Sequence, residues 1–118
     1  MKKINIIKKN EDYNRIIKTC KAYKYKDYVV YVENTTDKIY HFGFSVGKKI
    51  GNAVIRNKYK RRIKNILDKI PFKNNFNCII IVKKGILDKS FKQMEEDLIE
   101  LLKKINIIKE NVNEEKIS

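Results

Sequence analysis

Apolar residues recur with a helical period in three segments of the chain. They are Tyr13, Ile16, Ile17 and Cys20 in the first, Ile55, Tyr59, Ile63, Ile66, Leu67 and Ile70 in the second, and Phe91, Met94, Leu98, Leu101, Leu102 and Ile105 in the third. Asn10, Asn52 and Ser90 are placed to cap the free amides of the first turns, and Ser90 with Gln93 forms a capping box. Pro71 cannot continue a helical ladder, so the second helix ends before it. The pattern therefore predicts three amphipathic helices.

Two further segments have the composition of strands. Residues 28–32 are β-branched or aromatic throughout, with Val29 and Tyr31 on one face. Residues 34–37 are typical of a turn, so we expect residues 39–46 to return as the antiparallel partner of a hairpin. Gly43 within this second strand suggests a close backbone approach or a bulge. Residues 78–82 form an apolar run, which is typical of a strand buried on both faces.

The predicted order is helix, strand, strand, helix, strand, helix, with a further short strand between residues 39 and 46, which makes αβββαβα. Residues 23–27 are interpreted as a connector. With 118 residues the chain is expected to form one α+β domain, an α/β sandwich with a modest core. Residues 1–9 are expected to be a basic lead-in and residues 106–118 a tail, both flexible.

The charge of the chain indicates a polyanionic partner. The formal net charge is +14, and the 28 basic residues include only four arginines, three of which lie in the second helix. A lysine-rich helix face is often simply solvated, which is the structural alternative. No acidic residue falls between Gly47 and Leu67, however, so no ion pair within the helix offsets the repulsion. Because guanidinium binds phosphate through a bidentate fork, we interpret this helix as a nucleic-acid contact.

Other classes of function have little support in the sequence. No apolar run reaches transmembrane length, and the first residues lack the apolar core of a signal peptide, so we expect a cytoplasmic protein. Cys20 and Cys78 lack metal-ligand spacing, and we expect two buried free thiols. His41 is the only histidine, which argues against a zinc site or histidine-assisted nucleophilic catalysis. Residues 47–51 read GKKIG and lack the P-loop spacing.

The sequence FGFSVGKKIGNAVIRNKYKRRIK at residues 42–64 resembles the signature of the bacterial ribonuclease P protein subunit. The pattern is a Ser-Val strand end, Lys-Lys-x-Gly-x-Ala-Val, then Arg-Asn-x-x-Lys-Arg and a further basic residue. KKNEDY at residues 8–13 resembles the first helix of that family, and residues 90–104 resemble its last. The resemblance covers nearly the whole chain.

This resemblance implies a function that composition alone does not. Members bind a large catalytic RNA and assist the endonucleolytic removal of the 5′ leader from precursor tRNA. The RNA performs the chemistry with Mg²⁺ that it mainly holds itself, so we expect no protein catalytic residue, no protein metal site and no organic cofactor. The expected partners are the catalytic RNA and precursor tRNA, with no membrane and no further protein required.

The resemblance also implies roles for individual positions. The residues expected to bind the catalytic RNA are Lys48, Lys49, Asn52, Arg56, Asn57, Lys58, Lys60, Arg61, Arg62 and Lys64. The residues expected to line a cleft for the 5′ leader are Lys9, Tyr13, Ile17, Val29 and Tyr31. Aromatic side chains can stack on unpaired bases with little sequence preference.

The family fold adds an expectation that general rules would not. It has a small four-stranded mixed sheet of the ribosomal-protein S5 domain 2-like type, with a left-handed βαβ crossover around the Arg-Asn helix, whereas crossovers are otherwise nearly always right-handed. Three positions depart from the family pattern. Ile17 stands where an aromatic residue is usual, Lys64 where arginine is usual, and Gly47 where serine is common.

Three alternatives share parts of this evidence. A structural RNA-binding protein of the ribosomal type would have the same charge and fold class without a leader cleft. A major-groove DNA-binding domain lacks a helix-turn-helix partner here. A protein nuclease that needs no RNA would require clustered carboxylates for two metal ions, and most acidic residues fall in the last helix instead.

Overall fold

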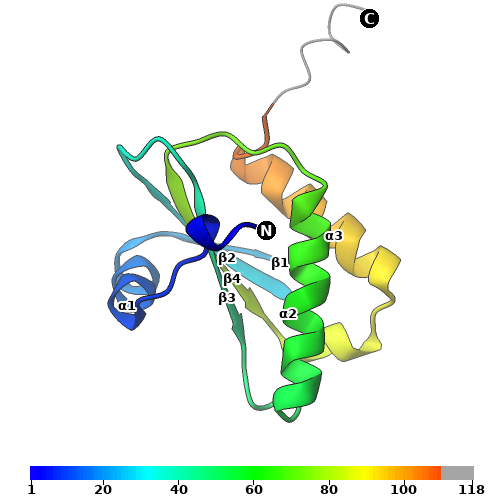
Figure 1. The fold of residues 1–118 in the computed structure, drawn as a ribbon. Coiled ribbons are helices and arrows are strands. Elements are labelled where there is room, and N and C mark those ends of the chain that lie inside the picture. Colours follow the sequence, from blue (N-terminus) through cyan, green and yellow to red (C-terminus); the bar gives the residue numbers. More distant parts are fainter. Residues whose placement is uncertain (110–118) are drawn as a thin grey trace, which may run out of the picture.

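The computed structural model describes residues 1–109 and has the α+β architecture expected from the sequence. Its elements are η1 (Lys3–Asn5), α1 (Asn10–Thr19), β1 (Ala22–Tyr25), β2 (Tyr28–Asn34), β3 (His41–Val46), α2 (Ala53–Asp68), β4 (Phe76–Val82), η2 (Lys84–Asp88) and α3 (Phe91–Ile105). The three main helices and the four-stranded mixed sheet match the expected composition of the fold. Figure 1 shows the sheet between α1 on one side and α2 and α3 on the other.

The order of the strands across the sheet is β1-β2-β4-β3. The expected hairpin between residues 28–32 and 39–46 is therefore wrong, because β4 lies between β2 and β3. β4 is antiparallel to β2 and parallel to β3, and α2 connects the parallel pair. The physical reason is that β4 is apolar on both faces, and only a central strand can bury both.

The additional strand is also placed differently from the expectation. It is β1, which lies in the segment interpreted as a connector, and it forms a hairpin with β2 in which Tyr25 pairs with Tyr28. Lys26 in the two-residue loop has a φ of 53°, the positive value that tight hairpin turns require. Tyr23 and Tyr25 alternate with lysines, which is the period-two pattern of a half-buried strand.

The main core lies between the sheet and the helices α2 and α3. Alternate residues of the strands face it, including the fully buried Tyr28, Phe42 and Ile80. The Tyr28 hydroxyl donates to the Met94 carbonyl of α3, and burial raises the pKa of Tyr28. A smaller core of Ile7, Ile16 and Ile79 lies on the opposite face, beneath α1. The sheet is thus covered on both faces, with α1 over only part of the second.

The helix ends agree with two of the three expected caps. Asn52 Oδ1 accepts from the Ile55 amide at 3.1 Å, and Ser90 and Gln93 form the capping box. The expected cap at Asn10 is wrong, because α1 begins with Asn10 itself and Lys9 occupies the cap position without a side-chain bond. Glu11 and Asp12 still place carboxylates in the first turn, where the helix dipole favours negative charge.

The segments before α1 and after α3 both contact the domain. Ile6 forms a parallel bridge with Phe42, and the Ile7 amide donates to the Phe42 carbonyl, so the lead-in lies along the outer edge of β3. Past α3, Ile107 is buried and its carbonyl accepts from the Lys73 amide. The rest of the expected tail, residues 110–118, lies outside the described residues.

Candidate nucleic-acid interface

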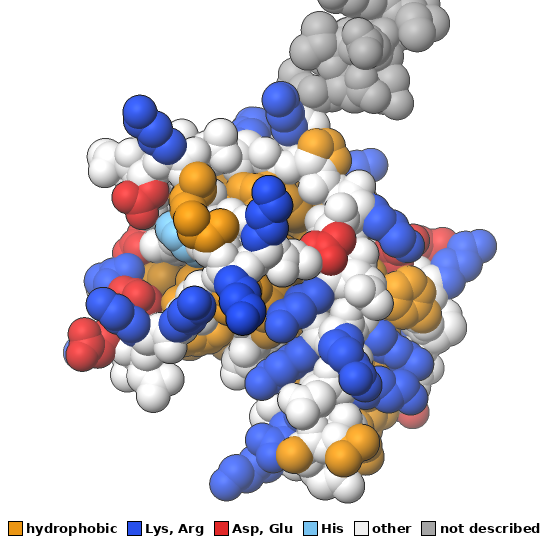
Figure 2. Space-filling view, in the orientation of Figure 1, with side chains coloured by type: hydrophobic (Ala, Val, Ile, Leu, Met, Phe, Trp, Pro, Cys, Tyr) orange, Lys and Arg blue, Asp and Glu red, His pale blue; other side chains and the backbone are white. Residues whose placement is uncertain are grey.

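Helix α2 separates most of its apolar side chains from its basic ones as the periodicity predicts, but Ile55 of the predicted stripe is 37% exposed and Ile70 lies beyond the end of the helix. Tyr59, Ile63, Ile66 and Leu67 are buried against the sheet and α3. Arg61 and Lys58 are exposed, and Arg56, Lys60, Arg62 and Lys64 are partly exposed. Figure 2 shows Lys and Arg side chains gathered over α2, with further Lys and Arg side chains between α2 and α1. The helix therefore presents a positive surface. We call the surface formed by Arg56, Lys58, Lys60, Arg61, Arg62 and Lys64 the basic ridge.

The basic ridge has no acidic partner in the described part of the chain. No side chain among Lys48, Lys49, Arg56, Lys58, Lys60, Arg61, Arg62 and Lys64 lies within 4.0 Å of a carboxylate of residues 1–109. Two of these cations lie over rings instead, Arg62 at 5.3 Å from the centre of Tyr59 and Lys64 at 5.8 Å from that of Phe44. These contacts orient the charged groups without neutralising them.

Arg15 has the opposite environment and serves as an internal comparison. Its guanidinium binds Glu33 at 2.9 Å and 3.0 Å and Asp12 at 2.7 Å. These hydrogen bonds raise the pKa of Arg15. The hydrogen bond to Arg15 also lowers the pKa of its partner Glu33. The fourth arginine is thus held inside the protein's own network, whereas the three arginines of α2 remain available to another molecule.

The loop before α2 presents its two lysines from a fixed backbone. Ile50 is buried, and its amide donates to the Gly47 carbonyl in a turn that leaves Lys48 and Lys49 exposed. A Cβ added to Gly51 would lie 2.9 Å from three carbons of Ile55, so only glycine allows the loop to run so close to the helix. An added Cβ at Gly47 would meet nothing within 4 Å.

The second candidate surface is the face of the sheet toward α1, where strand register aligns side chains in three rows. The end row is Glu33, Asn77 and His41, the middle row is Tyr31, Ile79 and Gly43, and the far row is Val29, Ile81 and Ser45. Helix α1 lies over the middle row, because Ile16 packs against Ile79 there. One flank of α1 consequently borders the end row and the other borders the far row.

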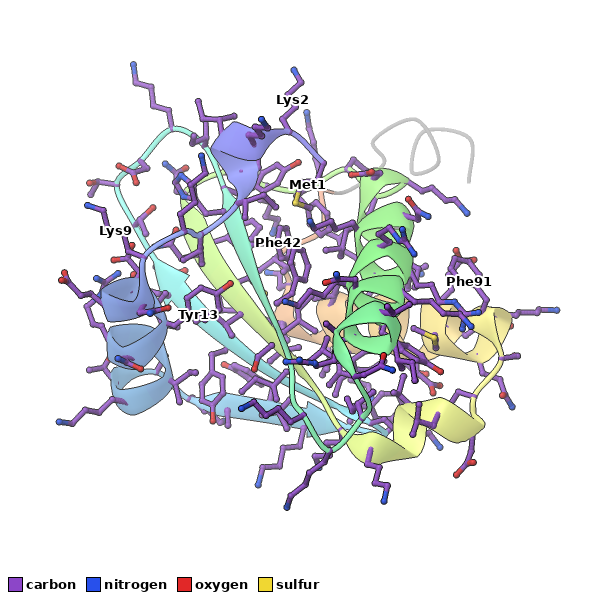
Figure 3. All side chains as sticks on the ribbon, turned by 60° about the horizontal axis from the view of Figure 1, so that its bottom comes forward. Met1, Lys2, Lys9, Tyr13, Phe42 and Phe91 are labelled. Atoms are coloured by element: carbon purple, nitrogen blue, oxygen red, sulfur yellow. The ribbon has the colours of Figure 1, made fainter. Side chains whose placement is uncertain are left out.

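Tyr13 attaches α1 to β3. Its hydroxyl accepts from the Phe44 amide at 3.1 Å, and a Cβ on Gly43 would lie 2.7 Å from the ring. Of the two expectations for Gly43, a close approach to the backbone is confirmed, and the approaching group is the Tyr13 side chain. The alternative, a bulge, is wrong, because the pairing register with β4 continues unbroken through Gly43. Figure 3 shows Tyr13 directed from α1 toward the sheet, with Lys9 at the beginning of the helix.

The residues expected to form the leader cleft are only partly grouped. Arg15 reaches the end row, so Ile17, which is about 200° further around the helix, lies on the opposite flank beside the far row. Ile17 is 37% exposed, while Val29 in the far row is buried. Tyr31 packs in the middle row, and Lys9 lines a pocket on the end-row flank. Ile81 and Ser45 share the far row with Val29, and only knowledge of the strand partners could have found them.

The remaining reactive groups form no further site within residues 1–109. This part of the chain contains no cluster of three or more His, Cys, Asp or Glu side chains that could hold a metal ion. Cys20 and Cys78 are free thiols, but the expected burial is wrong for Cys20, which is only half-buried. Cys78 is buried, and burial raises its pKa far above the ordinary value. None of the helices in the described part is both long and apolar enough to cross a bilayer.

Comparisons with known proteins agree with the fold and the motif. The family model for Ribonuclease P matches residues 1–106. The ribonuclease P protein component of Mycoplasma capricolum is 39% identical over 113 residues, covering 89% of this chain and 99% of that protein. The corresponding component of Streptococcus gordonii is 34% identical over 119 residues and covers 98% of each chain.

Solved structures give the same result in three dimensions. The Staphylococcus aureus RNase P protein superposes with a TM-score of 0.81 at 32% identity, covering 89% of this chain and 98% of that chain. The Thermotoga maritima protein gives a TM-score of 0.74 at 26% identity, covering 83% and 94%. Sequence and structure therefore place this chain in the bacterial ribonuclease P protein family, the protein component of the ribonucleoprotein that processes the 5′ ends of precursor tRNAs.

Proposed function

We propose that the basic ridge and the loop before it bind the catalytic RNA, and that the far-row flank of α1 binds the single-stranded 5′ leader. The residues proposed to contact the catalytic RNA are Lys48, Lys49, Asn52, Arg56, Asn57, Lys58, Lys60, Arg61, Arg62 and Lys64. Those proposed for the leader are Tyr13, Ile17 and Val29 on this flank, Tyr31 in the neighbouring middle row, and Lys9 at the beginning of α1, which also lines the pocket on the end-row flank. Together they would hold the precursor tRNA beside the RNA that cleaves it.

The observation that carries this proposal is the absence of carboxylate partners along the basic ridge within residues 1–109. Closely spaced cations on one helix repel one another, and a polyanion relieves that repulsion while releasing its counterions. Arginine adds bidentate contact with phosphate, which lysine cannot make. Asn52 also has a structural role, because its side-chain oxygen caps α2 and fixes the residue at which the helix begins.

The proposed leader site is supported by its mixture of flat and apolar side chains. Tyr31 is half-buried in the sheet, and Ile17 is exposed on the neighbouring helix flank. Such a surface can accept unpaired bases of any sequence, because every base has an apolar face. Isoleucine at position 17 offers contact area without aromatic stacking. In this proposal, stacking on leader bases is therefore provided by Tyr13 and Tyr31.

In this proposal hydrolysis belongs to the RNA. Magnesium ions held by RNA would stabilise the developing charge and activate the attacking water. Residues 1–109 offer no donor cluster that fits a metal ion, so we assign magnesium no protein ligand in this part of the chain. The contribution of the chain is to neutralise phosphates, which lets the folded RNA and the precursor approach each other at low magnesium concentration.

Reconstitution tests the proposal. The full chain is added to a bacterial ribonuclease P RNA at a magnesium concentration too low for the RNA alone, and 5′ processing of a precursor tRNA is followed. We expect processing to be restored, and the chain without RNA to leave the precursor intact. Failure to restore processing with an RNA that a related protein component does activate would refute the proposal.

The leader site is tested separately with Tyr31→Ala. We expect the variant holoenzyme to lose affinity for a precursor with a long leader by about 5- to 100-fold, the range for one lost base-stacking contact. Affinity for mature tRNA, which has no leader, should stay the same. Equal losses for the two RNAs would show that Tyr31 supports the fold instead of the leader.

A further inference from the structure

A chain of polar side chains crosses the end row of the sheet, on the flank of α1 away from the proposed leader cleft. Arg15 binds Glu33 through two nitrogens, and Asn77 Nδ2 donates to Glu33 Oε1 at 3.0 Å. His41 Nδ1 lies 2.9 Å from Asn77 Oδ1. Strand register aligns Glu33, Asn77 and His41 side by side, so backbone pairing holds this network in place.

The network fixes the hydrogen-bonding state of the histidine. Arg15 can only donate, and it keeps Glu33 ionised by lowering the pKa of that carboxyl. An ionised carboxylate can only accept, so Asn77 turns its amino group toward Glu33 and its carbonyl oxygen toward His41. His41 must then carry a hydrogen on Nδ1. In the neutral ring, Nε2 is consequently an acceptor, and the hydrogen bond of the His41 ring within residues 1–109 is made by Nδ1.

A pocket of about 500 Å³ adjoins this histidine. Its apolar side comes from Ile4, which is 65% exposed, from the partly buried Ile6, and from Ile7, which is buried. Lys3, Lys8 and Lys9 surround it, and none lies within 4.0 Å of a carboxylate in the described part of the chain. Figure 2 shows the histidine at the surface among hydrophobic and charged side chains. The volume falls within the range of about 300–1,000 Å³ that is usual for small-ligand sites.

The lining restricts what the pocket can take. The lysines and Arg15 attract negative charge. Asp12 is already paired with Arg15, so Asp37 is the lining carboxylate that has no cation within 4.0 Å in the described part of the chain. His41 Nε2 and the Asp37 carboxylate accept hydrogen bonds, so an occupant that also presents N–H donors fits the lining better than a simple anion. The occupant must also have a flat apolar face that can lie against the isoleucines of the pocket. A nucleotide combines these properties, because its base has amino or imino donors and its phosphate carries the charge.

We propose that this pocket binds a single unpaired nucleotide of RNA, with its base against Ile4 and Ile7, His41 Nε2 accepting from the base edge, and Lys8 and Lys9 at the phosphates. The inference rests on the proposed RNA-binding function. It adds a site on the other flank of α1 from the far row, and Lys9 at the beginning of the helix is shared with the proposed leader site. It also adds discrimination by hydrogen bonding, which a stacking surface lacks. The nucleotide comes either from the leader or from the catalytic RNA, and separate affinity measurements for precursor tRNA and for the catalytic RNA distinguish these sources.

The test combines a change in the protein with a change in the RNA. Holoenzyme is assembled with the full chain or with His41→Phe, which keeps a ring but has no nitrogen. Affinity is measured for precursor tRNAs whose leaders carry one abasic residue at successive positions. For the unsubstituted chain we expect one position at which base removal costs about three- to tenfold, the size of one hydrogen bond. His41→Phe should bind the intact leader weaker by the same factor and should not respond to base removal there.

A second arm measures affinity for the catalytic RNA alone. A three- to tenfold loss for His41→Phe in this arm, with no coupled position in the leader, assigns the nucleotide to the catalytic RNA. If the His41→Phe variant has the same affinity as the unsubstituted chain in both arms, the inference is overturned. Equal affinity for precursor and mature tRNA would instead reject the leader site of the proposed function, and the catalytic-RNA arm would still decide about the pocket.

A lysine variant keeps the inference testable if His41→Phe folds poorly. Lys8→Ala changes an exposed side chain and should reduce the salt dependence of binding in the same arm that His41→Phe affects. The matched control is Lys92→Ala, which removes an exposed lysine from α3 on the opposite side of the sheet and should leave the salt dependence unchanged. Equal salt dependence for the Lys8 and Lys92 variants would contradict the phosphate contact.

Discussion

Substituting alanine for Gly43 tests how α1 is attached to the sheet. The new Cβ would lie 2.7 Å from the Cζ and Oη atoms of Tyr13 and 2.9 Å from Cε1. Ordinary contact between such atoms begins at about 3.5 Å, so the ring must retreat by about 0.8 Å. The Tyr13 hydroxyl also accepts from the Phe44 amide at 3.1 Å, and the same movement stretches that bond beyond useful length.

The expected cost follows from these two effects. Overpacking of a fitted site costs about 1–3 kcal/mol, and loss of one hydrogen bond costs about 1 kcal/mol. Alanine also restricts the unfolded chain relative to glycine, which returns about 0.4–1 kcal/mol. The net prediction is that Gly43→Ala lowers the free energy of unfolding by about 1–3.5 kcal/mol. This loss is large relative to the stability of a small domain, typically about 5–15 kcal/mol.

Urea denaturation of the full chain measures the effect, and Gly47→Ala is the matched control. The same atom is added at Gly47, but nothing lies within 4 Å, so that variant should be as stable as the original or slightly more stable. Tyr13→Leu in the Gly43→Ala background makes room for the new methyl group. The double variant should therefore lose less stability than the two single changes added together.

Two results would refute this reasoning. If Gly43→Ala were as stable as Gly47→Ala, Tyr13 would not be fixed against β3. If the effects of Gly43→Ala and Tyr13→Leu simply added, the cost would come from some other contact.

Two further predictions concern charge. Arg56→Ala with Arg61→Ala should weaken assembly with the catalytic RNA and lower the slope of log affinity against log salt by about 1.4–1.8, as expected for two lost phosphate contacts; an unchanged slope would remove the ridge from the interface. The second concerns pH. The folded protein lowers the pKa of Glu33, so the stabilisation by Glu33 is complete above its unfolded pKa of about 4.3 and is lost as pH falls through the folded value. Denaturation from pH 7 to pH 3 should show the stability advantage over Glu33→Gln shrinking on acidification, and a constant difference would contradict the role of Arg15.

The helices could be located from the sequence because their signals are local. The period of Tyr59, Ile63 and Ile66 determines which face of α2 is buried, and the capping residues Asn52 and Ser90 determine where α2 and α3 begin. Neither signal depends on distant parts of the chain. The motif of residues 42–64 likewise identified the family, because its residues and their spacing are contiguous in the chain.

Strand pairing could not be read in the same way. Residues adjacent in sequence suggested a hairpin between β2 and β3, but β4, which follows only after α2, lies between them in the sheet. A signal for this arrangement was present, since residues 78–82 are apolar on both faces and need a central position. The alternating tyrosines of β1 carried a second signal. Each pattern describes one strand, whereas pairing is a property of two.

The sequence by itself determined the amphipathic helices, the excess of positive charge and the family, because spacing and composition are properties of the chain before it folds. Only the tertiary structure decided which charges are already paired. It brings Arg15 to Glu33 and leaves the arginines of α2 without carboxylate partners among residues 1–109. It also aligns Glu33, Asn77 and His41 across three strands. Hydrogen bonds and ion pairs act over a few ångströms, and only the pairing of distant segments brings such groups within that range.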